Sequence, residues 1–134
     1  MLHQIEHIGI AVSSLDVAIP HYETLLGTPC YKTETVESEF VRTAFFQVGP
    51  NKIELLESTT PDGVIAKYIA KRGEGIHHIA YAVKDIHAAM DYLRNEGYTL
   101  LNEAPKHGAD NKWVCFVHPK ETHGVLMELC MDRE

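Results

Sequence analysis

The sequence predicts an α+β fold in which two tandem βαβββ units form a curved mixed sheet around a metal site. A similar strand occurs twice, over 5–12 and 77–83, and alignment of the two copies superimposes His7 on His78. An amphipathic segment follows each copy, as expected of a helix that packs on a sheet. Each half also contains a later apolar strand with one glutamate. A duplicated unit that supplies one imidazole and one carboxylate per copy suits a metal site on a pseudo-twofold axis.

In the first half, we expect a helix between the repeated strand and three further strands. Ser14 or Asp16 can start this helix, and Gly27 followed by Pro29 ends it. Gly49-Pro50-Asn51 is typical of a hairpin turn between the last two strands. The predicted elements are strand 5–12, helix 16–26 and strands 31–36, 41–48 and 52–57.

The second half repeats this order after a linking helix over 62–72. Asp85 is expected to cap the second helix as Asp16 caps the first, and Gly97 to end it. We therefore expect one domain, 1–134, made of two βαβββ modules over about 1–60 and 75–134. The predicted elements of the second module are strand 76–83, helix 85–96 and strands 98–103, 112–118 and 124–130.

Composition narrows the classes of function. The 134 residues carry a net charge of −7 without a run of lysine or arginine, which disfavours nucleic-acid and anionic-membrane surfaces. No apolar stretch approaches the roughly 20 residues needed to span a bilayer. The first strand begins almost at the N-terminus, so we expect a cytoplasmic protein. Three cysteines without C-x-x-C spacing indicate reduced, packed thiols rather than a disulfide framework or a zinc site.

The repeated strands present their histidines on a face of small residues. Side chains alternate along a strand, so His7 shares its face with Gly9 and Ala11, and two alanines accompany His78. The opposite face is bulky, and we expect it to pack under helices. His77 lies on that opposite face and would replace His78 only through a one-residue slip in register.

The glutamates complete the candidate metal site. An isolated carboxylate on an apolar strand is costly, so it must be paired, protonated or bound to a metal. Two neutral histidines with Glu54 and Glu128 would neutralise a divalent cation, and such nitrogen and oxygen donors suit zinc, cobalt, nickel, manganese or ferrous iron. A single strand histidine is most often hydrogen-bonded, and a single strand glutamate most often faces water. The occurrence of both in matched pairs favours the metal interpretation.

The other polar residues are assigned ordinary roles. Glu37 and Glu39 are expected to be solvated, and Glu57 can be a charge at the rim of the site. Three isolated cations can contact an anionic substrate tail if the site opens toward them, namely Arg42, Lys106 and Lys120. The remaining histidines are interpreted as surface or capping groups: His3, His21, His87, His107, His118 and His123.

The residues His7, Glu54, His78 and Glu128 on paired βαβββ units resemble the vicinal oxygen chelate superfamily, which includes glyoxalase I and extradiol dioxygenases. Within it, the chain is similar to the methylmalonyl-CoA epimerases along nearly its full length. The more specific segments are Ala104-Pro105-Lys106-His107-Gly108-Ala109 and His118-Pro119-Lys120 with Gly124-Val125-Leu126-Met127-Glu128-Leu129.

The resemblance implies interconversion of (2R)- and (2S)-methylmalonyl-CoA by metal-assisted removal of the C2 proton. The implied ligands are His7, Glu54, His78 and Glu128, and Glu128 is also the implied catalytic residue. The implied cofactor is one divalent ion, with cobalt favoured over zinc, manganese or nickel. An acyl-CoA substrate and a homodimer are also implied.

One position departs from the family pattern. Some members carry a glutamate on the third strand that is proposed as a second base, and Thr43 stands there in this chain. The second acid–base group is therefore left open. Two other functions fit the same fold: a glyoxalase I-like metal-dependent lyase and a non-enzymatic small-molecule-binding module.

Overall fold

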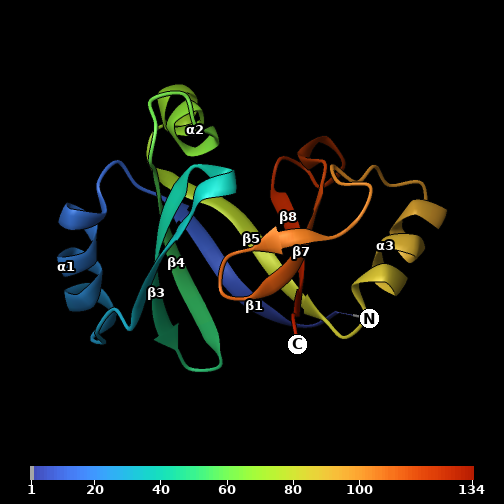
Figure 1. Cartoon of the computed structure of the whole chain (residues 1–134), viewed down its shortest axis with the longest axis horizontal. Coiled ribbons are helices and arrows are strands. Elements are labelled where there is room, and N and C mark those ends of the chain that lie inside the picture. The colour runs from blue at the N-terminus through green and yellow to red at the C-terminus, as the bar shows by residue number, and fades with distance from the viewer. Residues whose placement is uncertain (1) are drawn as a thin grey trace. The chain divides into compact units, whose positions relative to one another are not determined.

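The computed structural model describes residues 2–134, which divide into two compact units (Figure 1). The first unit is His7–His77, and the second comprises the residues up to Glu6 together with His78–Glu134. Two strands, β1 (Leu2–Ala11) and β5 (Gly75–Val83), have residues in both units. The strand order is β2-β3-β4-β1-β5-β8-β7-β6, so the predicted α+β class with a mixed sheet is confirmed.

In the first unit, β1 pairs in parallel with β4, and β3 pairs antiparallel with both β2 and β4. The β3–β4 hairpin turns at Gly49, whose φ of 59° lies in the left-handed region, as the sequence predicted for this turn. The remaining elements of this unit are α1 (Leu15–Leu26), β2 (Lys32–Val36), the 3₁₀ helix η1 (Glu37–Glu39), β3 (Val41–Val48), β4 (Asn51–Ser58) and α2 (Val64–Arg72).

The start of α1 is fixed by two side-chain oxygens. Ser14 has the extended backbone of an N-cap residue, and its Oγ accepts from the Val17 N–H at 3.3 Å. Glu57 Oε1 accepts from the Leu15 N–H at 2.7 Å. The expectation that Asp16 caps this helix is wrong, because Asp16 lies inside the first turn, where a carboxylate favours the helix dipole instead.

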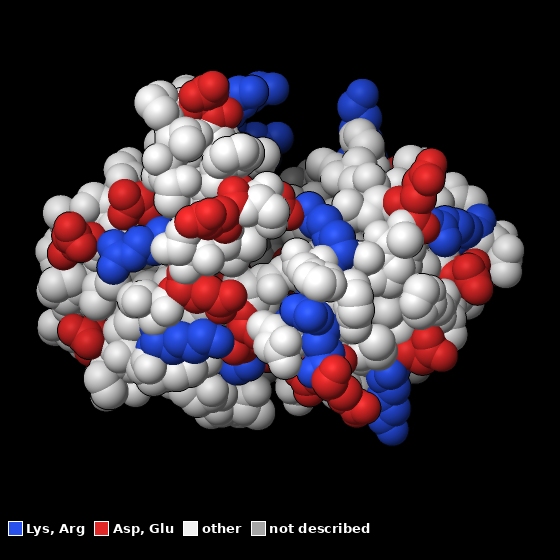
Figure 2. All heavy atoms as spheres, viewed as in Figure 1, with Lys and Arg blue, Asp and Glu red and all other residues white. Residues whose placement is uncertain are grey.

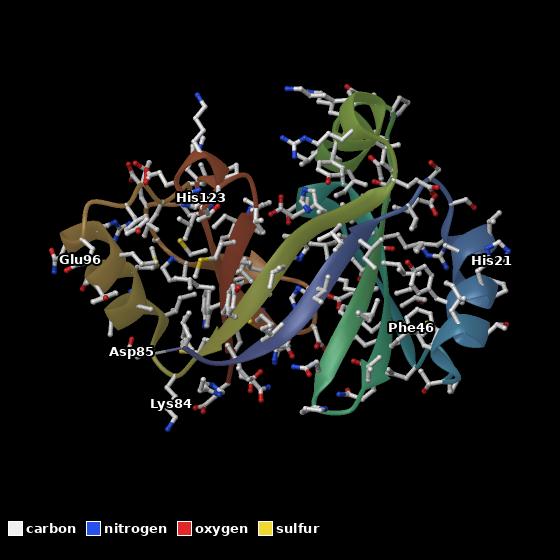
Figure 3. All side chains as sticks on the ribbon, turned by 180° about the vertical axis from the view of Figure 1, so that it is seen from behind. His21, Phe46, Lys84, Asp85, Glu96 and His123 are labelled. Atoms are coloured by element: carbon white, nitrogen blue, oxygen red, sulfur yellow. The ribbon has the colours of Figure 1, made fainter. Side chains whose placement is uncertain are left out.

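α1 packs on β3 and β4 through a fully buried cluster (Figure 1). Leu15, Phe46 and Leu55 form its centre, and Ile10 packs against it. Figure 3 shows Phe46 beneath the helix and His21 on its outer side. The bulky face of β1 therefore packs under a helix, as predicted, while the His7 side of the strand faces away from α1.

In the second unit, β5 pairs in parallel with β8, and β7 pairs antiparallel with both β8 and β6. The first unit uses the same pattern of one parallel and two antiparallel pairings. The remaining elements are α3 (Ile86–Asn95), β6 (Lys106–Gly108), β7 (Lys112–Val117), the 3₁₀ helix η2 (Pro119–Glu121) and β8 (Leu126–Asp132).

The predicted strand 98–103 is wrong. Leu100 forms only an isolated bridge to Val117. The ladder ends there because the side chain of Asn102, rather than a backbone carbonyl, accepts from the Phe116 N–H at 3.0 Å. Arg94 further binds the carbonyls of Asn102 and Glu103, so these groups are satisfied outside the sheet. The strand of this edge is β6, which begins after Pro105.

α3 begins as predicted. Asp85 Oδ1 accepts from the Ala88 N–H at 3.0 Å, and Figure 3 places Asp85 and Glu96 at opposite ends of the helix. Buried Ile86 and Met90 pack this helix against the sheet.

The three cysteines are free, as expected. Burial raises the pKa of the Cys115 thiol, so it stays protonated at neutral pH. Among the described residues, no helix combines the length and the apolar character required to cross a membrane.

Replacement of Asp85 by alanine should lower the free energy of unfolding by about 1 kcal/mol, because the Ala88 N–H loses its cap. Chemical denaturation monitored by circular dichroism measures this loss. Asp91→Ala is the matched control, since Asp91 lies on the same helix and makes only an exposed contact of 3.9 Å with Arg94. Equal losses in the two variants would contradict the capping role.

Candidate metal centre

The first unit holds a buried histidine–glutamate pair. Gly9 of β1 stands opposite Glu54 of β4, so His7, two residues earlier on β1, lies on the same face as Glu54. His7 Nε2 lies 3.4 Å from Glu54 Oε1, and both side chains are buried. The parallel pairing of β1 with β4 thus brings an imidazole and a carboxylate together beneath the surface.

The second unit holds an equivalent pair in the same register. Ala80 of β5 stands opposite Glu128 of β8, and His78 precedes Ala80 by two residues as His7 precedes Gly9. His78 Nε2 lies 3.4 Å from Glu128 Oε1, and both are again buried. The match between the two units therefore extends to the distance between their polar atoms.

Each pair has the geometry of two donors that share an ion. A neutral imidazole nitrogen and a carboxylate oxygen both present lone pairs, which repel unless a proton or a cation lies between them. Two donors bound at about 2.1 Å lie about 3.0 Å apart at a right angle and about 3.4 Å apart at the tetrahedral angle. The observed 3.4 Å falls at the wide end of that range. Within each unit, the buried histidine and glutamate could thus each contribute one ligand atom to a metal ion.

A phenylalanine and a lysine accompany the carboxylate of the first unit. Phe45 of β3 stands directly opposite Glu54, and Lys32 of β2 stands directly opposite Phe45. Lys32 Nζ lies 5.4 Å from the centroid of the Phe45 ring. An apolar ring next to the glutamate limits water on that side, and the ammonium lies over the electron-rich ring face.

The second unit repeats this arrangement with another phenylalanine and another lysine. Phe116 of β7 stands opposite Glu128, its ring meets the His78 ring edge-on at 6.2 Å, and Lys106 Nζ lies 5.4 Å from its centroid. Lys106 therefore shares a sheet face with Glu128, and its contact with a substrate tail stays a prediction. Lys120 is exposed on η2.

The other cation considered for substrate binding lies elsewhere. Arg42 is adjacent to Thr43 on β3, so its side chain lies on the opposite face of the sheet. Its guanidinium Nη1 lies 3.7 Å from Asp16 Oδ1. Glu57 is not a rim charge, because its carboxylate accepts from the Leu15 N–H at the start of α1. Figure 2 shows acidic and basic side chains interspersed over the visible face, without a continuous basic surface.

The two adjacent histidines of β5 have different environments. His78 is buried beside Glu128, whereas His77 is partly exposed and meets the ring of Tyr68 at 5.0 Å. This agrees with the predicted register. His118 Nδ1 accepts from the Lys120 N–H at 3.1 Å, so this histidine is a capping group, as expected. The other histidines assigned to the surface are exposed: His3, His21, His87, His107 and His123.

The position of the second base lacks an acid. Thr43 is 0% exposed, and its hydroxyl donates to the Glu34 carbonyl at 3.3 Å. A threonine hydroxyl is not ionised at neutral pH, so it cannot replace a carboxylate as the base. Glu37 of η1 is exposed, in line with the expected solvation.

A cavity of about 580 Å³ opens in the first unit near the start of α1. Val17, His21, Tyr22 and Glu74 are among its lining residues, and none of the four candidate ligands is. Its acidic member, Glu74, accepts from the Ser13 N–H at 2.8 Å. This cavity is thus separate from the candidate metal ligands.

Comparison with known proteins identifies the family. The family model of the glyoxalase/bleomycin resistance protein/dioxygenase superfamily matches residues 6–116. The ethylmalonyl-CoA/methylmalonyl-CoA epimerase of Cereibacter sphaeroides is 37% identical, over 96% of this chain and 98% of that protein. The mitochondrial methylmalonyl-CoA epimerase of Homo sapiens is 36% identical, over 96% of this chain and 73% of that protein.

A solved structure agrees with these matches. A variant of the Streptomyces coelicolor methylmalonyl-CoA epimerase, in complex with 2-nitronate-propionyl-CoA, superimposes with a TM-score of 0.94 and 36% identity. The match covers 98% of this chain and 96% of that one. By its sequence and by its fold, the chain belongs to the methylmalonyl-CoA epimerase family of the glyoxalase/bleomycin resistance protein/dioxygenase superfamily.

Proposed function

We propose that this protein interconverts (2R)- and (2S)-methylmalonyl-CoA by exchanging the proton at C2. The observation that carries the proposal is the matched pair of buried histidine–glutamate contacts, His7 with Glu54 and His78 with Glu128. They occur in a chain whose relatives are named methylmalonyl-CoA epimerases. A relative of known structure binds a nitronate analogue of the acyl-CoA, which supports an acyl-CoA substrate.

The four side chains His7, Glu54, His78 and Glu128 are proposed to hold one divalent cation together. Two neutral imidazoles and two carboxylates balance its charge, which removes the cost of burying both acids. Cobalt is the favoured ion, and zinc, manganese and nickel suit the same donors. The equal separation of 3.4 Å in both pairs supports this assignment.

The chemistry requires a stabilised enolate and groups that move a proton. When bound, a divalent ion supplies Lewis-acid polarisation of the substrate oxygens. Glu128 is proposed as a catalytic residue next to C2, in addition to its role as a ligand. Phe45 and Phe116 stand beside the two glutamates and exclude water from them, which strengthens the electrostatic interactions there.

The proposal also includes the location and the oligomeric state of the enzyme. We infer a cytoplasmic homodimer that acts on a small acyl-CoA molecule. The interspersed charges on the face seen in Figure 2 and the net charge of −7 support a partner other than nucleic acid.

Replacement of His78 by alanine should abolish metal retention and turnover, because Glu128 loses its partner at 3.4 Å. Metal content after dialysis, measured by mass spectrometry, checks the first effect. His77→Ala is the matched control, since His77 contacts Tyr68 instead. A metal content in His78→Ala equal to that in His77→Ala would exclude His78 as a ligand.

Incubation of the wild-type protein with methylmalonyl-CoA in deuterated water should give deuterium at C2 with loss of stereochemistry. A chelator should stop this exchange, and added cobalt should restore it, because the enolate depends on the bound ion. Proton NMR follows both the label and the epimer ratio. Absence of exchange with every metal, together with thioester formation from methylglyoxal and glutathione, would instead indicate the glyoxalase I-like lyase.

A further inference from the structure

We propose that Glu34 is one of the two acid–base groups that exchange the C2 proton, in place of the acid that is missing at Thr43. This assignment rests on the proposed epimerase function. It names a residue for the second acid–base group, whose identity the sequence left open. All of its structural support lies within the first unit.

The register of β2, β3 and β4 places Glu34 on the metal-ligand face. Glu34 of β2 stands directly opposite Thr43 of β3, and Phe45, two residues after Thr43, stands opposite Glu54 of β4. Residues opposite each other or two apart share one face of a sheet. A carboxylate at position 34 is thus displaced by only one strand spacing, about 5 Å, from a carboxylate at position 43.

Contacts hold the Glu34 carboxylate on this face. Its Oε1 lies 3.5 Å from Lys32 Nζ, and the same ammonium lies 5.4 Å from the centroid of the Phe45 ring. Phe45 in turn stands beside Glu54. A chain of neighbouring side chains therefore leads from the candidate ligand to the carboxylate.

Exposure also distinguishes Glu34 from its neighbour. The side chain of Glu34 is 31% exposed, whereas Thr43 is 0% exposed. A partly exposed carboxylate can reach a bound substrate and exchange its proton with water between turnovers, as an acid–base group must.

Other acids of the first unit are engaged or point elsewhere. Glu57 accepts from the Leu15 N–H, and Glu74 accepts from the Ser13 N–H. Asp16 lies 3.7 Å from Arg42 on the opposite side of β3. Among the described residues of β1 to β4 within this unit, Glu34 is the one carboxylate besides Glu54 on the ligand face.

The proposed step balances without a further reactant. The Glu34 carboxylate takes the proton from C2 and becomes a carboxylic acid, while the C–H electron pair moves into the enolate. An acid on the opposite face of the substrate then donates a proton to C2, which inverts the centre. In the reverse direction the two groups exchange roles, and each returns to its starting protonation state through water.

The test compares Glu34→Gln with Glu37→Gln, which removes the same charge from an exposed position on η1. Each purified variant is incubated with either epimer of methylmalonyl-CoA in deuterated water, and its bound metal is measured. In Glu34→Gln, epimerisation should fall by roughly 10²–10⁴-fold, as expected for loss of an acid–base group. Deuterium should still enter one epimer with retention of configuration, because the remaining group can remove and return a proton on its own face. Metal content should match the wild type, and Glu37→Gln should behave as the wild type throughout.

The possible outcomes separate the two proposals. A wild-type protein without exchange would end the proposed function itself. Epimerisation by Glu34→Gln within about twofold of an active wild type would overturn only the role of Glu34. Loss of bound metal, or loss of exchange from both epimers, would also overturn it, because an acid–base group on one face leaves the other half-reaction intact. Retained one-sided exchange establishes the assignment.

Discussion

The cost of burying a carboxylate controls the design of this protein. Glu54 and Glu128 lie on central strands among apolar residues, where an uncompensated charge would be strongly destabilising. Each has one imidazole nitrogen at 3.4 Å, and a cation held between the two groups would compensate its charge. Because the imidazole must come from a parallel neighbour in a defined register, the positions of β1 and β5 relative to β4 and β8 are constrained by the same requirement. The pairing of the strands thus brings each buried carboxylate to its imidazole.

The two units share this arrangement but differ in where its lysine stands in the sheet. Both retain a phenylalanine opposite the glutamate and a lysine at 5.4 Å from its ring. Yet Lys32 stands directly opposite its phenylalanine, whereas Lys106 stands opposite Val114, two residues from Phe116. The distance between the ammonium and the ring is thus the same in both units, although the lysine occupies a different register position.

Much of this arrangement was predictable from the sequence. Period-two alternation placed His78 rather than His77 with Glu128, and capping rules located Asp85 at the start of α3. Other features depend on tertiary contacts. The strand expected over 98–103 is replaced because the Asn102 side chain takes a ladder amide, which no local pattern indicates. The position of Glu34 on the ligand face was not predictable, because it depends on the pairing of Glu34 with Thr43. That pairing is set by the turn between β2 and β3, which includes η1 and Phe40 at a φ of 55°.

The exchange of strand segments between the units has a consequence for how the chain folds. The residues up to Glu6 belong to the second unit, although the first unit follows them directly along the chain. A polypeptide cut within the linking helix α2 would leave neither half with all of its own unit, since the residues up to Glu6 would be separated from the second unit and residues 73–77 from the first. Neither half is consequently expected to fold autonomously.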